Sequence, residues 1–321
     1  MIVPQSFADH VAAAAGAPGR AWLATLPALA GAYCRRWSLT LDGPAMHGYV
    51  GLVLPVSRVD GTRAVLKLSW RDEETRDEPV ALAAWRGEGA VRLLANAPED
   101  GVLLLERLDP ERTLAGVPVA PATAVAAGLL RRLAVPAPPL SRALRAQAAE
   151  WVEELPELWE ELDRPLPRPM LDAAVEVCRT RGPAAGDLLV NEDLHYDNVL
   201  ARGKDPATWV VIDPKPIAGD VEFGVIPLLW NRLAESTLDE RFGWVVAGAE
   251  LDPALAREWT LVRAVINWLW CLDEDDEDDE DDEGEDGADE PDDPDGPDGE
   301  EDWLLAAVRR IAGWAYSGGA G

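Results

Sequence analysis

Apolar and polar positions in the first third of the chain change their period near residue 37. Residues 4–36 repeat apolar side chains at helical spacing, interrupted at residues 16–19, and predict two helices. From residue 37 onward, apolar and polar positions alternate as they do in strands. The predicted strands are residues 37–41, 49–58, 63–70, 91–94 and 102–105. Because the strands follow one another closely, this region predicts a five-stranded antiparallel sheet.

The rest of the chain is mainly helical in its pattern. A helix is predicted at residues 71–85, with a later start at Glu78 as the alternative, because Pro79 is disfavoured inside a helix. Pro156 is expected to break a helix predicted at residues 144–162. The other predicted helices are residues 122–134, 171–180, 225–233, 254–272 and 303–315. The sequence therefore predicts an α+β protein with two lobes, residues 1–107 and 108–321.

The charge of the chain is concentrated in one tract. Residues 273–302 contain 22 acidic residues and no basic ones, and without these acids the formal net charge of −30 becomes −8. Such dense like charge repels itself and predicts a disordered insert between two helices. A solvated loop is the favoured interpretation, and a trap for Mg²⁺ or a polycationic compound is the alternative. A nucleic-acid partner is not expected, because no basic patch is present to neutralise phosphates.

The cysteines and the apolar runs indicate a cytoplasmic protein. Cys34, Cys178 and Cys271 are odd in number and far apart, which argues against a disulfide framework and a zinc site. The N-terminus lacks the pattern of a signal peptide. No apolar run reaches the roughly 18 to 20 residues that a membrane span needs. We therefore expect no membrane association, while the sequence does not indicate an oligomeric state.

Candidate chemistry is concentrated in residues 188–216. The pattern predicts strands at residues 188–190, 198–201 and 209–212, with a polar loop after the first strand and a turn at residues 203–206. A hairpin would bring three polar side chains to one end, namely Asp193, Asn198 and Asp213. Two carboxylates and an amide oxygen are suitable ligands for Mg²⁺, which also binds water and phosphate. The alternative is that polar residues gather here only because they form turns.

The same stretch carries a family resemblance. The run DLHYDNVL, followed by VIDPKPIAGD and PLLWNR, resembles the aminoglycoside phosphotransferases, which have a protein-kinase-like fold. It is most similar to their streptomycin 6-kinase and hydroxyurea phosphotransferase branch. This resemblance implies that Asp193 is the catalytic base and that Asn198 and Asp213 bind Mg²⁺. It also implies ATP as the phosphate donor.

A lysine in the predicted sheet fits this resemblance. Lys67 lies between apolar neighbours in the third predicted strand, where an ammonium group is costly unless it meets an anion. The resemblance implies that Lys67 contacts the α- and β-phosphates of ATP and pairs with Glu78. Glu74 is the rival partner, and a solvent-facing lysine is the alternative.

Two further segments are expected at the nucleotide. A loop with glycines at residues 43–48 would cover the phosphates through backbone N–H groups, although a plain surface turn is an equal alternative. After the last predicted strand, the backbone at Glu106 and Leu108 would contact the adenine ring, as the hinge of a kinase does.

Several residues near the predicted catalytic loop remain open. His195 is expected to hold the loop rather than to exchange protons. Asn191 stands where relatives often have His, and Gly224 stands near a position where many relatives have an Asp that braces the loop. Asp220 is expected to cap a helix, and Lys215 to contact phosphate, Asp220 or only solvent.

Three functions remain open at this point. The leading hypothesis is an ATP-dependent kinase that phosphorylates an alcohol group of a cationic aminoglycoside such as streptomycin, in antibiotic inactivation or secondary metabolism. The second is a metabolic kinase with another small-molecule acceptor. The third is a nucleotide-binding pseudokinase whose acidic tract recruits a basic partner.

Overall fold

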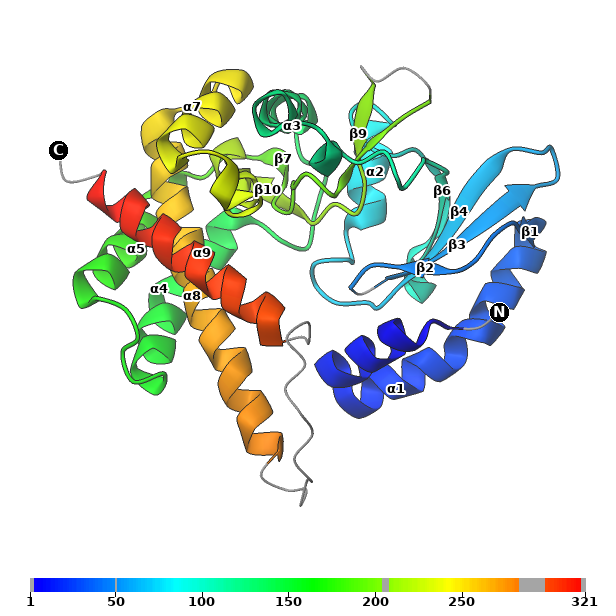
Figure 1. The fold of residues 1–321 in the computed structure, drawn as a ribbon, viewed down its shortest axis with the longest axis horizontal. Helices are drawn as coiled ribbons and strands as arrows, with labels where there is room; N and C mark the ends of the chain where they lie inside the picture. Colours follow the sequence, from blue (N-terminus) through cyan, green and yellow to red (C-terminus); the bar gives the residue numbers. More distant parts are fainter. Residues whose placement is uncertain (1–2, 50, 204–207, 283–297, 319–321) are drawn as a thin grey trace. The chain divides into compact units, whose positions relative to one another are not determined.

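The computed structural model describes residues 3–49, 51–203, 208–282 and 298–318, and it divides the chain into two units (Figure 1). The first unit comprises Met1–Leu114, Ala137–Ser141 and Asp197–Pro216. The second comprises Ala115–Pro136, Arg142–Tyr196 and Ile217–Gly321. The predicted division at residue 107 therefore misses two later segments of the first unit. The segment Asp197–Pro216 is bound to the rest of the first unit by backbone hydrogen bonds. The N–H of Val91 donates to the carbonyl of Val211, and the N–H of Val211 donates to the carbonyl of Gly89.

The first unit is built on an antiparallel sheet. Its strands are β1 (Leu39–Leu41), β2 (Met46–His47), β3 (Gly51–Arg58), β4 (Arg63–Ser69), β5 (Leu93–Ala97) and β6 (Val102–Glu106). The strand order is β1-β3-β4-β6-β5, and β2 pairs with β3. All five predicted strands are present, and β2 is an additional short strand within the predicted loop at residues 43–48.

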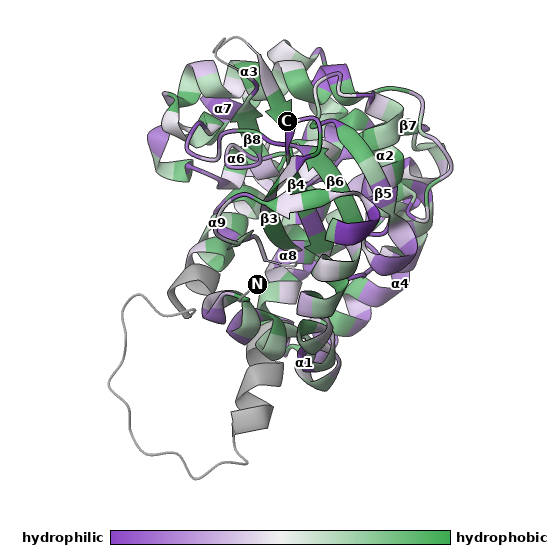
Figure 2. Ribbon diagram, turned by 90° about the vertical axis from the view of Figure 1, so that its right-hand side faces the viewer, coloured by the Kyte–Doolittle hydropathy of each residue, from purple (hydrophilic) through white to green (hydrophobic). Residues whose placement is uncertain are grey.

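Helix α1 (Gln5–Arg36) covers one face of this sheet (Figure 1). Its backbone leaves helical geometry at Gly16, where φ is 52° and ψ is −135°, which agrees with the predicted interruption. Apolar side chains of α1 pack on those of the sheet, including Leu66 and Leu68 of β4. Successive side chains of a strand point to opposite faces, so Lys67 lies on the other face. Figure 2 shows the hydrophobic character of β3, β4 and β6.

Helix α2 (Glu78–Trp85) begins at the later of the two expected positions. Pro79 lies in its first turn, where a missing N–H costs nothing because that group would have no partner within the helix. Residues 71–77 form turns instead, with Thr75 and Asp72 hydrogen bonded to each other. Asp77 accepts hydrogen bonds from the backbone N–H and the hydroxyl of Ser141. These bonds attach the segment Ala137–Ser141 to the rest of the first unit.

The second unit is mostly helical. Its helices are α3 (Val119–Leu133), α4 (Leu144–Glu161), α5 (Arg168–Arg181), α6 (Pro227–Trp230), α7 (Leu238–Ala249), α8 (Pro253–Asp282) and α9 (Asp298–Ser317). Helices α8 and α9 lie side by side, as do α3 and α7 (Figure 1). The helix predicted at residues 225–233 is shorter than expected, since its α-helical part is α6 alone, with the 3₁₀ turn Val221–Gly224 before it and the 3₁₀ turn Leu233–Glu235 after it. None of the helices in the described ranges is long and apolar enough to cross a membrane.

Helix α4 is continuous through Pro156, so the predicted break is wrong. A proline in a helix removes one backbone hydrogen bond and disfavours the turn before it. The buried side of α4, with Ala148, Trp151, Leu155 and Trp159, extends on both sides of the proline. We infer that this packing outweighs the local cost and holds the two halves in one helix.

The acidic tract is helical at both of its ends. Helix α8 extends to Asp282 and α9 begins at Asp298, so the prediction of disorder for the whole of residues 273–302 is wrong there. Extending an existing helix costs less than starting one, which favours continuation of α8 into the tract. Residues 283–297 lie outside the described residues.

Candidate functional site

The candidate metal-binding residues lie at one end of a short hairpin. Strands β8 (Val199–Ala201) and β9 (Trp209–Val211) pair antiparallel, with Val199 opposite Val211. The backbone N–H of Ile212 donates to the carbonyl of Asn198 at 2.8 Å. Asn198 directly precedes β8, and Asp213 follows Ile212 at the end of β9, so both residues lie at the same end of the hairpin. Of the turn expected at residues 203–206, residues 204–206 lie outside the described residues. The hairpin brings together two of the three polar residues predicted there, both in the first unit.

Lys67 joins this hairpin to the sheet. Its Nζ donates to Asp213 Oδ1 at 2.6 Å and to Glu78 Oε2 at 2.7 Å. Lys67 and Glu78 are only 4% and 1% exposed, whereas the Asp213 side chain is 42% exposed. Three segments distant in sequence thus meet at one ammonium group, and the carboxylate of Asp213 remains accessible from solvent.

Burial and charge oppose each other at this lysine. Burial would lower the pKa of Lys67, but the charges and hydrogen bonds of Asp213 and Glu78 outweigh it and raise the pKa. Burial raises the pKa of the Glu78 carboxyl to about 7, and the charge of Lys67 opposes that rise. Lys67 is therefore a fixed positive charge in the neutral pH range.

Two glycines lie close to these charged groups. An ideal Cβ at Gly48 would lie 3.7 Å from Asp213 Oδ2, and one at Gly51 would lie 3.2 Å from Cε of Lys67. The glycine-containing loop expected over the phosphates therefore ends beside Asp213, and Gly51 leaves room for the stem of Lys67. A side chain at Gly51 would have to displace that stem.

The structure distinguishes Glu78 from Glu74, its rival as the partner of Lys67. Glu74 binds Lys215, with 2.7 Å between Oε2 and Nζ. The carboxylate of Glu106 binds Arg202, and its backbone N–H donates to the carbonyl of Arg92 at 3.0 Å. Leu108 is half-buried in the segment after β6.

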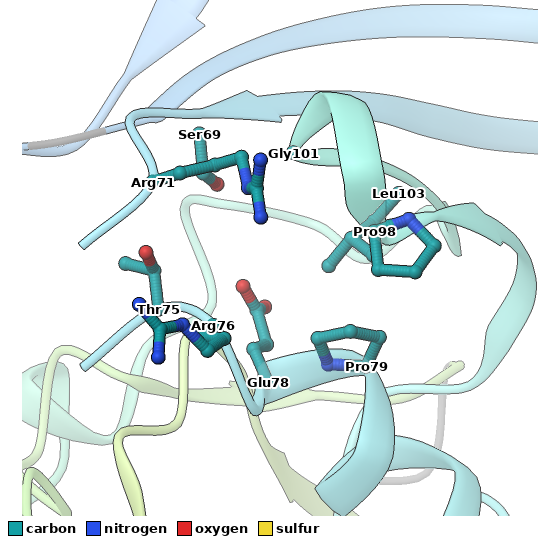
Figure 3. Close-up of a pocket in the computed structure, with 9 residues that line it drawn as sticks. All are labelled: Ser69, Arg71, Thr75, Arg76, Glu78, Pro79, Pro98, Gly101 and Leu103. Atoms are coloured by element: carbon teal, nitrogen blue, oxygen red, sulfur yellow. The ribbon is translucent and has the colours of Figure 1, made fainter. Parts of the chain in front are cut away.

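A small cavity lies beside Glu78, between the start of α2 and the strands β4 and β6 (Figure 3). Its volume is about 20 Å³, which is room for about one water molecule and far below the size of a nucleotide site. Figure 3 shows the carboxylate of Glu78 pointing into it from α2, opposite Ser69 and Arg71. Neither Glu78 Oε1 nor Ser69 Oγ has a hydrogen-bond partner among the described residues. The cavity therefore has room for one water molecule beside the outer oxygen of Glu78.

The loop that carries Asp193 belongs to the second unit and follows β7 (Leu188–Asn191). Leu194 and Tyr196 are fully buried, and the Tyr196 hydroxyl hydrogen bonds with Thr123 and with the carbonyl of Leu228. The side chain of Asn191 accepts from the backbone N–H of Asp193 at 3.2 Å and so braces the loop locally. Alternate residues thus anchor the loop and leave Asp193 half-buried.

No motif in the sequence predicts the groups that hold Glu192, the residue before Asp193. Glu192 is 5% exposed, and its carboxylate forms an ion pair with Arg142. Its carbonyl accepts a hydrogen bond from Arg263 of α8 at 2.7 Å. These partners are 50 and 71 positions away.

Asp220 has a different role from the expected helix cap. It stands at the start of a 3₁₀ turn without a side-chain capping hydrogen bond. Its carboxylate accepts instead from the backbone N–H of Gly186 at 2.8 Å and from the indole N–H of Trp259 at 2.9 Å. Asp220 therefore connects the segment before β7 to α8.

The fold is that of protein-kinase-like enzymes. The structure is similar to the choline kinase LicA from Streptococcus pneumoniae, with a TM-score of 0.57, 14% identity and coverage of 90% of this chain and 99% of that one. It is also similar to an aminoglycoside 2′-phosphotransferase, with a TM-score of 0.55, 12% identity and coverage of 91% and 98%. The predicted two-part α+β class is thereby confirmed.

Sequence comparison specifies the family. Residues 36–275 match the model of the aminoglycoside/hydroxyurea antibiotic resistance kinases. The chain is 42% identical over 282 residues to streptomycin 6-kinase of Streptomyces griseus, covering 85% of this chain and 91% of that one. It is 44% identical over 269 residues to hydroxyurea phosphotransferase of Kitasatospora aureofaciens, covering 81% and 77%. This chain belongs to the aminoglycoside/hydroxyurea antibiotic resistance kinase family, and it is a phosphotransferase that acts on a hydroxyl group.

Proposed function

We propose that this kinase transfers the γ-phosphate of ATP to a hydroxyl group of a cationic aminoglycoside such as streptomycin, and so inactivates the antibiotic. The observation that carries the proposal is the ammonium group of Lys67, held by Glu78 and Asp213. The relatives named streptomycin 6-kinase, at 42% identity over most of their length, support the choice of acceptor.

In this proposal the first unit holds the donor. Lys67 contacts phosphate oxygens, and Glu78 orients Lys67. The amide oxygen of Asn198 and the carboxylate of Asp213 fit Mg²⁺, since both are hard oxygen ligands at one end of the hairpin. The bound ion would neutralise charge on the transferred phosphate. The N–H of Glu106 is already used within the sheet, so adenine recognition would fall to its carbonyl and to the backbone of Leu108.

Asp193 is the proposed catalytic base. It would accept the proton of the acceptor hydroxyl and orient that oxygen toward the γ-phosphate. Its half-buried position between the anchored residues Glu192 and Leu194 supports this role, because a base must be both fixed in place and accessible. The supporting hydrogen bond from its N–H to Asn191 suggests that Asn performs the bracing expected of His at that position.

Hydroxyurea is a second candidate acceptor. The specific observation in its favour is the 44% identity to hydroxyurea phosphotransferase. Its hydroxyl group offers the same chemistry to Asp193, without the cationic groups of an aminoglycoside. Comparison of the two compounds in one assay separates the candidates.

The test is Mg²⁺-dependent ADP release from ATP by the purified protein, with streptomycin, with hydroxyurea and without acceptor. We expect streptomycin to stimulate release. We expect Asp193→Asn to lower kcat by about 100- to 10,000-fold, the usual contribution of general base catalysis, and to leave ATP affinity nearly unchanged.

Asp187→Asn is the matched control. Asp187 lies shortly before β7 in the same unit, and its side chain is 91% exposed. It should keep full activity. If neither acceptor stimulates release although ATP binds, the proposed function is wrong. Slow release without acceptor would then favour a kinase with another acceptor, and no release at all would favour a nucleotide-binding role without turnover. Stimulation by hydroxyurea alone would change the acceptor and retain the chemistry.

A further inference from the structure

Glu192 is a firmly held residue in the loop that carries Asp193. It directly precedes Asp193, and both its side chain and its backbone have charged partners. Its carboxylate pairs with Arg142, and the side chains of this pair are only 6% and 10% exposed. Its carbonyl accepts from Nη1 of Arg263 at 2.7 Å. Hydrogen bonds to charged donors are about twice as strong as neutral ones, so Glu192 is fixed at two points.

The direction of Arg263 is itself fixed. Its guanidinium carbon lies 4.9 Å from the centre of the Phe223 ring and 5.7 Å from that of Trp230. A second contact of Nη1 reaches the carbonyl of Phe223 at 3.4 Å. A planar guanidinium held against aromatic faces retains little freedom, whereas a lysine ammonium in its place would keep much more. Helix α8 thus presents one N–H to the carbonyl of Glu192 in a single orientation.

Gly224 cannot supply this support, because its backbone already packs against the end of β7. An ideal Cβ there would lie 3.0 Å from the carbonyl oxygen of Asn191, 2.9 Å from Cδ1 of Leu130 and 3.2 Å from Cγ1 of Val190. The sequence left open whether a chain with glycine at this position lacks a brace for the catalytic loop. The contacts of Arg263 provide one from α8.

We propose that Arg263 is a positioning residue for Asp193, acting through the carbonyl of Glu192, with Arg142 holding the side chain of the same residue. This inference rests on the proposed function, in which Asp193 is the base. Reacting groups must be placed within a fraction of an ångström, and a displacement of about 1 Å costs up to about 100-fold in rate. A shift of the Glu192 carbonyl is transmitted to Asp193 through one peptide bond.

The experiment compares Arg263→Met with Arg257→Met. Arg257 is a matched control on the same helix: it lies 3.8 Å from the Trp314 ring centre and donates to the Trp314 carbonyl at 3.2 Å, away from the Asp193 loop. Arg263→Met should lower kcat for streptomycin phosphorylation by about 10- to 100-fold and change the KM for ATP by less than about twofold. Arg257→Met should keep kcat. Arg263→Lys, which retains one donor without the planar fork, should recover part of the lost rate.

Amide hydrogen exchange of residues 192–196 separates this proposal from the proposed function. Exchange should accelerate in Arg263→Met and not in Arg257→Met. If Arg263→Met loses stability as Arg257→Met does but keeps its kcat, Arg263 is merely structural and the proposal is overturned. If the wild-type protein phosphorylates neither streptomycin nor hydroxyurea, the proposed function fails. In that case amide hydrogen exchange alone tests the role of Arg263, and unchanged exchange of residues 192–196 in Arg263→Met overturns the proposal.

Discussion

At the scale of single residues, positions near the candidate site are determined by what their neighbours leave room for. Gly51 and Gly224 are both glycines that other atoms approach closely, but for different reasons. Gly51 makes room for the stem of Lys67, and Gly224 allows the backbone of the 3₁₀ turn to pack against Asn191 and Leu130. Neither position has a positive φ, so the constraint is space rather than backbone conformation.

Replacement of Gly224 by alanine should therefore be harmful. The new Cβ would press on the carbonyl of Asn191 and on Leu130, and overpacking of this kind costs about 1–3 kcal/mol. We expect Gly224→Ala to lower the free energy of unfolding by that amount in urea denaturation, and also to lower kcat. Gly128→Ala in α3 is the control, because no atom lies within 4 Å of its Cβ. That variant should gain about 0.5–1 kcal/mol from helix propensity, and equal stability of the two variants would contradict the argument.

The sequence predicted residue pairs well where a motif linked them. The Lys67–Glu78 pair was expected from the strand lysine and the start of α2, and the structure has it. Arg142, Arg263 and the true partners of Asp220 were missed. No motif or period connects residues 50 or 71 positions apart, and an arginine on an amphipathic helix looks like any solvent-exposed arginine until the packing is known.

At the scale of elements, the periodicity was a good guide to strands and a weaker one to helix ends. The sheet has the five expected strands because each is an apolar run bounded by turn residues. The local rule failed at Pro156, where α4 continues. Propensity acts over one turn, whereas the buried side of α4 extends over the whole helix, so packing decided the outcome.

Pro156→Ala should stabilise the protein. Proline in a helix interior is about 3 kcal/mol less favourable than alanine, and part of this gain is offset because alanine leaves the unfolded chain freer. We expect a net increase of about 1–2 kcal/mol in the free energy of unfolding, measured by urea denaturation, with unchanged kcat. Pro165→Ala, in the segment between α4 and α5, should not stabilise. A loss of stability in Pro156→Ala would mean that the helix requires the proline.

At the scale of the whole molecule, the charge is divided unevenly. The tract at residues 273–302 accounts for most of the net charge of −30. Helices α8 and α9 extend into it from both sides, so part of the charge is carried on ordered backbone. The field of such a tract is screened over about 8 Å at physiological ionic strength, which limits its reach to nearby sites.

Neutralising the tract should leave catalysis unchanged. We expect a full-length variant with every Asp and Glu of residues 273–302 changed to Asn and Gln to keep its KM for streptomycin within about twofold. This follows from screening at about 0.15 M salt and from the interpretation of the tract as a solvated segment. The measurement is the KM at low and at physiological salt. A KM that rises only at low salt would support the alternative, in which the tract concentrates cationic substrate.

The first unit is assembled from three separate stretches of the chain, and this has a consequence for gene exchange among relatives. Asp213 is 146 positions from Lys67, although both belong to that unit. A single recombination crossover between them would combine a lysine from one parent with an aspartate from the other. A hybrid that inherits the unit whole must also take residues 137–141 and 197–216 from the same parent. Exchange of donor-binding properties between such genes therefore requires several crossovers. In contrast, α4 and α5 lie together in residues 142–196 and α7–α9 in residues 217–321, and a single inserted segment can replace either block.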